Sequence, residues 1–387
     1  MYLSFVISER ESLIVFHLKV CIFIIEGDKM KQFTLGPVEM YERTKAVGAL
    51  PNIYFRTPEF SSFMKETDEL LRRFFSVSSE YHTIIMASSG TGAMEATLHN
   101  CFTHKDKMLI IKGGKFATYF INMCEYQSIP FDTIDIPFGD ALTTELLAPF
   151  EKKGYTALLV NIHETSTGQL YDKQMLRNFC MRNNMYFIVD AISSIVADEV
   201  NLSKCSMDAV IFSSQKGLAL APGLGIIILG DKIYNERVKD NKTTSLYFDF
   251  KQYIKNMERF QTPFTPAINI LYQLNDMLKY LLEQGGAMQM AEKTNRLAEY
   301  FRQKAKQMGF KALSFPTSNA LTPLYFTDIS AFDIHTILKE KYDIMVNPSG
   351  LLPENLLPVG HFGNLSKSDY DTLLSAMTAV CEGLKNG

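Results

Sequence analysis

The sequence predicts an α/β fold, with a large domain built on a mostly parallel β-sheet and a smaller α+β domain at the C-terminus. The chain has 387 residues, more than one hydrophobic core usually organises, so two domains are expected. Short apolar runs alternate with longer segments of helical period between Thr83 and Leu229, as in strand-helix units. After Asp231 long helical segments take over, before strands and helices alternate again from about Gly309.

The expected strands are a few residues long and rich in Ile, Val or Leu, which is typical of strands buried on both faces. They are Thr83–Ala87, Met108–Ile111, Thr133–Ile136, Ala157–Ile162, Phe187–Val189, Ala209–Phe212 and Gly225–Leu229. Segments of helix length and mixed polarity lie at Met94–Phe102, Thr144–Lys153, Lys173–Asn183, Asn269–Leu282 and Gly286–Met308. We therefore assign residues 30–285 to the large domain and residues 286–387 to the small one.

Residues 1–29 differ from the rest of the chain. Ser12–Ile25 is an apolar run interrupted by His17 and Lys19. The run is too short to span a bilayer and lacks the small-x-small cleavage site of a signal peptide. We expect an extension of doubtful structure, with Met30 opening the functional chain and no association with a membrane.

Composition excludes several classes of function. Hydrophobic residues make up 47% of the chain and charged residues 21%, values typical of an ordinary globular protein. With 39 basic against 42 acidic side chains, the net charge of -3 does not favour nucleic acid as a partner. The six cysteines are scattered, without a Cys-x-x-Cys pair, so neither a metal site nor a disulfide framework is expected, and a cytoplasmic location is favoured.

A turn rich in glycine and hydroxyl groups follows the first expected strand, at Ser88-Ser89-Gly90-Thr91-Gly92. Glycines let a ligand approach the backbone, and the N–H groups at a helix N-terminus favour an anion. The turn therefore predicts a phosphate site. The alternative is a simple turn with a helix cap, which needs only one of the hydroxyls.

Two charged residues stand at the ends of expected strands. Asp190 follows Phe187–Val189, and Lys216 follows the strand that ends at Phe212. Parallel sheets bind ligands beyond the carboxyl ends of their strands, so both residues are expected to face a site. A lysine in apolar surroundings loses its proton more readily, as a Schiff-base nucleophile requires. Taken singly, Asp190 could cap a helix and Lys216 could extend into solvent.

Taken together and in this order, these features resemble those of the class V aminotransferases, which bind pyridoxal 5'-phosphate (PLP) on fold-type I. The resemblance runs from Met30 to the C-terminus. It is strongest within the branch that contains 2-aminoethylphosphonate–pyruvate, alanine–glyoxylate and serine–pyruvate aminotransferases. The motifs that carry it are Phe33–Val38, the turn at Ser88–Gly92, Glu164–Gly168, Val189–Ser194 and Ser214–Lys216.

This resemblance implies roles for individual residues. Lys216 is expected to hold PLP covalently and to move a proton between the substrate carbon and the cofactor. Asp190 is expected to pair with the pyridine nitrogen, Thr165 to bond near the ring oxygen, and Phe116 to stack on the ring. The phosphate is expected to lie against Ser89, Gly90, Thr91 and Gln215.

The same resemblance implies a homodimer with shared active sites. The segment Thr262-Pro263-Phe264-Thr265-Pro266 resembles the loop that reaches the partner subunit's phosphate in this family. Either Thr262 or Thr265 is the expected contact.

One motif departs from the family pattern. The family usually has Phe-Arg-x-Gly-x-x-Gly near the C-terminus, where the arginine grips the substrate carboxylate. This chain has Leu357-Pro358-Val359-Gly360-His361-Phe362-Gly363, and its last arginine is Arg302. Either another cation binds the carboxylate or the substrate differs. The substrate-binding candidates are Gly36, Arg56 as the leading substitute cation, and His361, with Lys115 a weaker choice.

Three functions compete. The first is an aminotransferase that moves the amino group of 2-aminoethylphosphonate, alanine or serine to pyruvate or glyoxylate. The second is a PLP-dependent lyase or desulfurase of the same class, but a desulfurase needs a cysteine near the small domain, and none lies between Cys205 and Cys381. The third is a PLP-fold protein whose transaminase activity is altered or lost.

Overall fold

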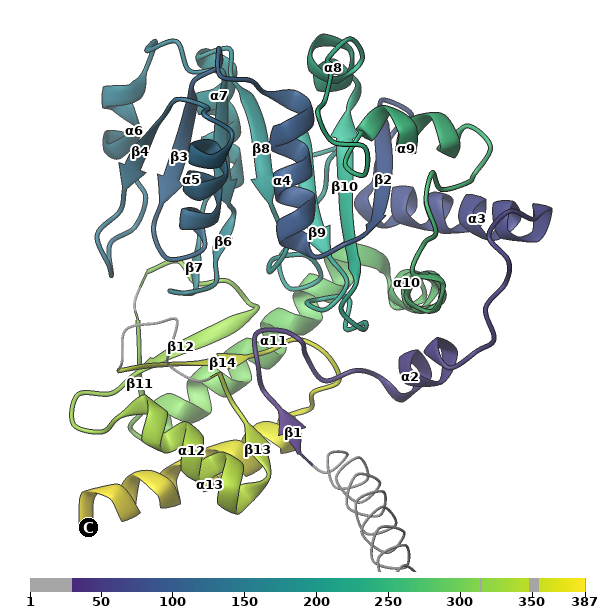
Figure 1. Ribbon diagram of the computed structural model, residues 1–387. Coiled ribbons are helices and arrows are strands. Elements are labelled where there is room, and N and C mark those ends of the chain that lie inside the picture. Colours follow the sequence, from purple (N-terminus) through teal and green to yellow (C-terminus); the bar gives the residue numbers. More distant parts are fainter. Residues whose placement is uncertain (1–29, 314, 348–354, 387) are drawn as a thin grey trace, which may run out of the picture.

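A computed structural model describes residues 30–313, 315–347 and 355–386; the extension predicted at residues 1–29 lies outside this range. Its largest element is a seven-stranded sheet (Figure 1) in the order β2-β10-β9-β8-β5-β3-β4. The strands are β2 (Tyr81–Ala87), β3 (Met108–Lys112), β4 (Phe131–Asp135), β5 (Ala157–Asn161), β8 (Tyr186–Asp190), β9 (Ala209–Ser213) and β10 (Leu224–Gly230). Every strand expected between Thr83 and Leu229 is present.

The sheet is parallel except at β10, which runs antiparallel to both β2 and β9. The predicted α/β class with a mostly parallel sheet is thus confirmed. Because β5, β8 and β9 are parallel neighbours, Asn161, Asp190 and Ser213 end their strands at one edge. Any ligand that these strand ends bind is expected at this edge.

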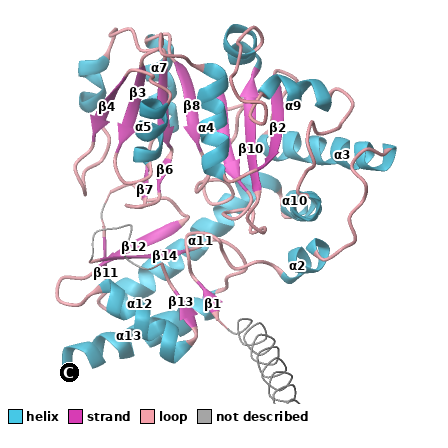
Figure 2. Ribbon diagram, in the orientation of Figure 1, coloured by secondary structure: helices cyan, strands magenta, loops and turns pink. Residues whose placement is uncertain are grey.

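Helices cover both faces of the sheet (Figure 2). In β9, Ile211 packs with the helices of one face and Phe212 with those of the other, as expected for a strand buried on both sides. The first face carries α4 (Gly90–Cys101), α5 (Ala117–Tyr126) and α9 (Phe250–Met257). The second carries α3 (Pro58–Phe75), α7 (Lys173–Arg182) and α10 (Ile268–Glu283).

Among the helices that differ from the sequence prediction, α6 and α3 show the largest differences. The helix expected at Thr144–Lys153 is a short α6 (Thr144–Leu147) followed by a 3-10 turn, Ala148–Phe150. Pro149 explains the break, because its ring has no N–H to continue the α-helical bonding. The 18-residue α3 was not predicted, although Thr57 caps it by accepting from the Phe60 N–H at 3.3 Å, a recognisable start signal.

The C-terminal part of the chain forms a second, antiparallel sheet in the order β11-β12-β14, packed against three helices. These elements are β11 (Lys311–Ala312), β12 (Leu321–Tyr325), β14 (Leu356–Gly360), α11 (Gly286–Gln307), α12 (Ala331–Tyr342) and α13 (Lys367–Asn386). The expected small C-terminal sheet is therefore present, while the domain boundary at residues 285–286 stays a prediction. The remaining short elements are β1 (Lys31–Gln32), α2 (Glu42–Gly48), β6 (His163–Glu164), β7 (Gln169–Leu170), α8 (Asp231–Ile233), a π-helical turn at Tyr234–Val238, and β13 (Ile344–Met345).

The N-terminal segment ties the small sheet to the large one. β1 pairs in parallel with β13, and the Gly360 N–H of β14 donates to the Phe33 carbonyl at 2.8 Å. Two residues later, the Leu35 carbonyl accepts a hydrogen bond from Lys216, which lies in the loop after β9 of the large sheet. The small domain thus holds a segment that reaches the strand ends of the large one.

Candidate functional site

A cavity of about 240 Å³ lies at the carboxyl ends of β5, β8 and β9. It brings together nine of the predicted site residues: Gly36, Ser89, Gly90, Thr91, Phe116, Thr165, Asp190, Gln215 and Lys216. The other lining residues are Met94, Tyr119, Asn161, His163, Ile192 and Ser193. Sequence reasoning did not predict this second group.

Lys216 lies at the centre of the site. Its side chain is only partly exposed, and its ammonium group donates to the Leu35 carbonyl. Burial lowers the pKa of Lys216 to about 8, although the nearby Asp190 opposes the shift. A lysine with this pKa is unprotonated far more often at neutral pH than an exposed one, so it can act as a nucleophile.

Asp190, the last residue of β8, is the buried counter-charge. Burial raises its pKa to about 6, while a hydrogen bond from the Ile192 N–H at 2.8 Å and another from the Asn161 amide act against the shift. At pH 7 the carboxylate is therefore mostly ionised. Each of its oxygens has one donor, so a cationic partner can still be accommodated.

The glycine and hydroxyl turn begins α4. Ser89 is the N-cap, and its hydroxyl accepts from the Gly92 N–H at 3.1 Å. The turn is therefore a helix cap, which was the alternative to a phosphate site. Gly90 and Thr91 also line the cavity, which places the N-terminus of this 12-residue helix at the site. A Cβ on Gly90 would lie 2.5 Å from Ile192 Cδ1 and 3.1 Å from Ser213 Cβ, so a larger residue there would require the Ile192 side chain to move. The turn can thus be both a helix cap and a phosphate site.

Gly36 adopts φ +121°, a conformation that side chains rarely tolerate. A Cβ there would lie 2.5 Å from Lys216 Cδ and 2.9 Å from Lys216 Cε. The glycine is therefore needed for the N-terminal segment to pass directly over the lysine.

Three buried polar atoms around the cavity have no hydrogen-bond partner: Asn161 Oδ1, His163 Nε2 and Gln215 Oε1. Buried polar atoms are rarely left so, and clusters of them point to a bound molecule. A sequence signal for Asn161 existed, because it is a polar residue at the end of a buried parallel strand.

Five predicted residues lie outside the cavity in the single chain: Lys115, Arg56, Thr262, Thr265 and His361. Arg56 is bound to the 261–263 loop, donating to the Thr262 carbonyl at 2.6 Å and the Pro263 carbonyl at 3.0 Å. Thr262 and Thr265 line a separate small pocket beside Tyr247. Arg56 is thus occupied by the loop and does not reach Lys216 within one chain.

His361 also lies apart from Lys216. Its ring is buried, with Nε2 2.8 Å from the Thr322 hydroxyl and Nδ1 2.8 Å from the Tyr370 hydroxyl. Burial, followed by the charge of Arg302, lowers its pKa well below the ordinary value. This geometry gives His361 a packing role in the small domain and leaves it no free atom for a substrate.

Pro358 lies in β14 directly opposite Pro323 of β12. Opposite residues of antiparallel strands share a face. Pro323 packs against Gly168, because a Cβ added to Gly168 would lie 3.1 Å from Pro323 Cγ. Pro358, where the resemblance led us to expect arginine, therefore lies on the face of the small sheet that packs against Gly168. Proline supplies no charge there.

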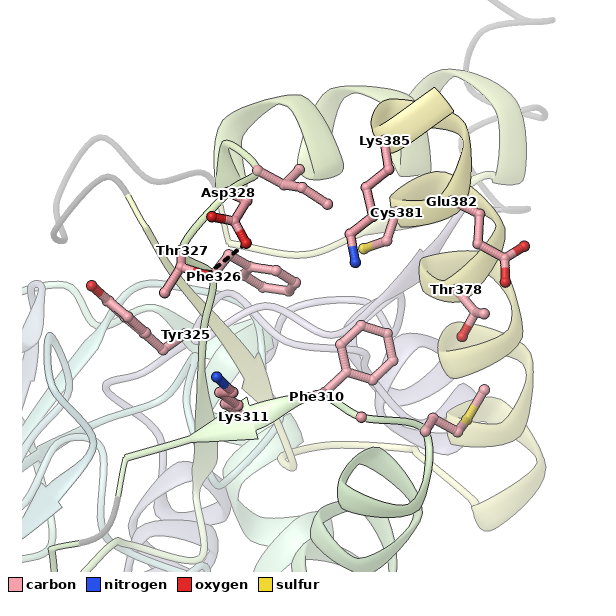
Figure 3. Close-up of a pocket in the computed structure, with 13 residues that line it drawn as sticks. Phe310, Lys311, Tyr325, Phe326, Thr327, Asp328, Thr378, Cys381, Glu382 and Lys385 are labelled. Carbon is pink, nitrogen blue, oxygen red and sulfur yellow. Dashed lines mark hydrogen bonds between the residues drawn. The ribbon is translucent and has the colours of Figure 1, made fainter. Parts of the chain in front are cut away.

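A larger cavity of about 330 Å³ lies in the small domain between β12 and α13 (Figure 3). The rings of Phe310 and Phe326 meet edge to face, with centroids 6.1 Å apart, and the Asp328 carboxylate turns to the Thr327 hydroxyl. Burial raises the pKa of the Cys381 thiol, so it is not an activated nucleophile. None of the predicted site residues lines this cavity.

The described residues contain neither a membrane-spanning helix nor a cluster of metal-ligating side chains. No helix among them is both long and apolar enough to cross a membrane. Within the same residues, no three His, Cys, Asp or Glu side chains gather as metal ligands would.

Comparison with known proteins agrees with this geometry. A family model described as aminotransferase class V matches residues 37–351. An uncharacterized aminotransferase of Methanocaldococcus jannaschii is 29% identical over 90% of this chain and 92% of its own length. A serine–glyoxylate aminotransferase of Hyphomicrobium methylovorum is 27% identical over 87% of this chain and 85% of its own. The solved alanine–glyoxylate aminotransferase of Nostoc sp. shares the fold, with a TM-score of 0.84 at 23% identity over 91% of this chain and 95% of its own.

Proposed function

Because the chain belongs to the class V aminotransferases, we propose that it binds PLP through Lys216 and transfers an amino group from a small donor to a 2-oxo acid. The proposed donors are 2-aminoethylphosphonate, alanine and serine, and the proposed acceptors are glyoxylate and pyruvate. The names of two similar enzymes, a serine–glyoxylate and an alanine–glyoxylate aminotransferase, support glyoxylate as the acceptor.

The residues around Lys216 fit PLP in their chemistry. The N-terminus of α4, with Ser89, Gly90 and Thr91, is suited to the phosphate, and Gln215 lies beside it on the lysine loop. Asp190 is a buried anion with room for one more donor, which suits a protonated ring nitrogen. The unpartnered atoms Asn161 Oδ1 and His163 Nε2 also call for a polar ligand.

When bound, PLP serves as an electron sink for the negative charge left on the substrate carbon by proton loss. Asp190 favours that chemistry by keeping a positive charge at the ring nitrogen. Lys216, with a pKa of about 8, is unprotonated in about a tenth of molecules at pH 7. It can therefore attack as a nucleophile and, once released, hold and return the proton.

Two apolar side chains of the cavity would orient a planar ring bound there. Phe116 and Ile192 both line it, and the Lys216 ammonium lies 6.0 Å from the centroid of the Phe116 ring. A flat aromatic side chain excludes water and favours an offset-stacked partner.

We also propose a homodimer, in which the Thr262–Pro266 loop completes the site of the partner subunit. Two observations support this proposal. Arg56 binds the loop through the Thr262 and Pro263 carbonyls, and both threonines line a separate pocket, away from the cavity of their own chain.

The observation that carries the proposed function is the partly buried Lys216 beside Asp190 at the N-terminus of α4. Purified protein supplied with PLP should develop a visible absorption band, and Lys216→Ala should abolish it. Lys112→Ala is the matched control, since Lys112 makes an exposed ion pair with Asp135 and does not line the cavity. A wild type that stays colourless would refute PLP binding.

The donor can be identified by adding 2-aminoethylphosphonate, alanine and serine separately to the coloured protein. A true donor converts the visible band, and subsequent glyoxylate or pyruvate restores it. If none of the donors converts the band, while PLP remains bound, the transfer reaction proposed for these substrates is wrong.

A further inference from the structure

Glu164 is a buried carboxylate beside the cavity, and the proposed function gives it no role. It ends β6, directly before Thr165, and its exposed fraction is only 1%. Burial raises the pKa of this carboxyl, and the groups that act against the shift are uncharged N–H and O–H donors. A buried carboxylate is costly unless its oxygens accept hydrogen bonds. Its donors therefore indicate which part of the fold it stabilises.

Four donors converge on the Glu164 carboxylate from two segments of the chain. Its own segment supplies the Ser166 N–H at 3.0 Å and the Ser166 hydroxyl at 2.6 Å, both to Oε1. The turn before α5 supplies the Phe116 N–H at 3.2 Å to Oε1 and the Ala117 N–H at 3.2 Å to Oε2. The carboxylate thus binds two residues that lie 48 and 47 positions away in the sequence.

The first turn of α5 has no side-chain cap of its own. Its N-cap residue is Phe116, whose side chain has no atom that accepts a hydrogen bond. The N–H groups of residues 118 and 119 donate to backbone carbonyls at 3.1 and 3.2 Å, so those of Phe116 and Ala117 remain. Glu164 accepts from both, and its negative charge suits a helix N-terminus.

The turn also packs directly on this carboxylate. A Cβ added to Gly114 would lie 2.6 Å from Glu164 Cδ and 2.3 Å from Ser166 Oγ. The Lys115 N–H donates to the same Ser166 oxygen at 2.8 Å, and the serine hydroxyl donates in turn to Glu164. Residues 114–117 are therefore held against Glu164 and Ser166 through their main chain.

We infer that Glu164 is a positioning residue, which fixes the Phe116 ring at the wall of the cavity; the consequence for PLP rests on the proposed function. Glu164 does not line the cavity itself, whereas Phe116 does. Tyr119, on the same helical turn, also lines it and stacks on Phe116, with ring centroids 5.9 Å apart and planes inclined by 26°. Glu164 binds the Phe116 N–H, so weakening this bond loosens the backbone that carries the ring.

Glutamine cannot fully replace this carboxylate. A carboxylate offers two acceptor oxygens, while the glutamine amide offers one oxygen and an NH2 group that only donates. In Glu164→Gln, the Ala117 N–H that now meets Oε2 would therefore face another donor. Loss of one charge-assisted hydrogen bond changes an equilibrium constant by roughly ten- to a hundredfold.

The first test measures amide hydrogen exchange in the protein without PLP. In Glu164→Gln, the amides of residues 116 and 117 should exchange roughly ten- to a hundredfold faster than in the wild type, because the start of α5 opens more often. Unchanged exchange at these two amides would show that Glu164 does not hold the turn.

Asp172→Asn is the matched control for both tests. Asp172 is the N-cap of α7, which has ten residues like α5, and it accepts from the Gln174 and Met175 N–H groups at 2.8 and 3.0 Å. It does not line the cavity. This control should leave the exchange of residues 116 and 117 unchanged.

The second test measures the dissociation constant of PLP from the visible band. A stacked ring pair is worth roughly two- to tenfold in affinity, so Glu164→Gln should raise Kd by about that factor, and Asp172→Asn should not change it. In the Phe116→Leu background, Glu164→Gln should change Kd by less than about twofold, because the ring that it positions is gone. A general loss of stability would not depend on Phe116 in this way.

The outcomes separate this inference from the proposed function. If Glu164→Gln raises Kd by the same factor with and without the Phe116 ring, Glu164 does not act through Phe116 and the inference is wrong. A wild type that stays colourless with PLP would instead refute the proposed function, and with it the consequence for PLP. The exchange test would still decide whether Glu164 holds the turn.

Discussion

Gly36→Ala is the substitution that tests the packing over Lys216 most directly. The new Cβ would stand 2.5 Å from Lys216 Cδ and 3.2 Å from the Gln215 carbonyl oxygen. Carbon atoms in contact are about 3.5 Å apart, so the lysine chain has to move by about 1 Å. The carbonyl on the other side belongs to the backbone and restricts the room for that movement.

Two costs add in this variant. A side chain at positive φ costs about 1–2 kcal/mol, and forcing atoms into a packed site costs about 1–3 kcal/mol more. The free energy of unfolding should therefore fall by about 2–5 kcal/mol. A displacement of about 1 Å at a reacting group lowers the rate by about a hundredfold, and we expect kcat to fall by that amount.

Gly139→Ala separates the two costs. Gly139 also has positive φ, +93°, but a Cβ there would meet nothing within 4 Å. This control should lose only about 1–2 kcal/mol of stability and keep its kcat. Urea unfolding and steady-state kinetics on both variants give the comparison. If Gly36→Ala retains wild-type kcat, the close passage of the N-terminal segment over Lys216 is not what positions the amine.

Two further predictions concern charge at the site. The pKa of Lys216 falls from its ordinary value of 10.5 to about 8 on folding, so the unfolded chain binds more protons between these pH values. The free energy of unfolding of the cofactor-free protein should rise across that window, by about 2 kcal/mol after allowance for partial exposure, and urea titrations of Lys216→Met should lack the rise. Pro358→Arg should lower the KM for alanine about tenfold, because a charge-assisted hydrogen bond becomes available, and an unchanged KM would contradict the assigned direction of this side chain.

The sequence predicted the site residues that lie directly after buried strands. Lys216, Asp190 and the Ser89–Thr91 turn were predicted from their positions after buried runs, and the structure brings all of them to one cavity. The reason is geometric, since parallel strands deliver their carboxyl ends to the same edge of a sheet. Helix α3 was not predicted, although Thr57 and Pro58 give its start a recognisable signal.

The directions of the hydrogen bonds that His163 and Thr165 make could not be predicted in the same way. His163 is an acceptor only because Ser193, which follows a different strand, takes its Nδ1 hydrogen. Thr165 is one because the same serine takes its hydroxyl hydrogen. Hydrogen-bond direction thus depends on residues 28 and 30 positions away, and local sequence carries no signal for it.

Arg56 and Arg302 show why the sequence does not reveal which cation replaces the arginine expected at Pro358. Arg302 is far from Pro358 in sequence, yet the fold places it beside β12, where it donates to the Ser318 carbonyl at 2.7 Å, to the Leu321 carbonyl at 3.1 Å and to the Thr322 hydroxyl at 3.0 Å. Arg56 is bound to loop carbonyls in a similar way. Each guanidinium thus makes hydrogen bonds to three oxygen atoms of the protein, and proximity alone does not make either arginine a carboxylate clamp. Among the described residues that line the cavity, Lys216 supplies the cation, so a substrate carboxylate must find its partner beyond these side chains or be absent from the preferred donor.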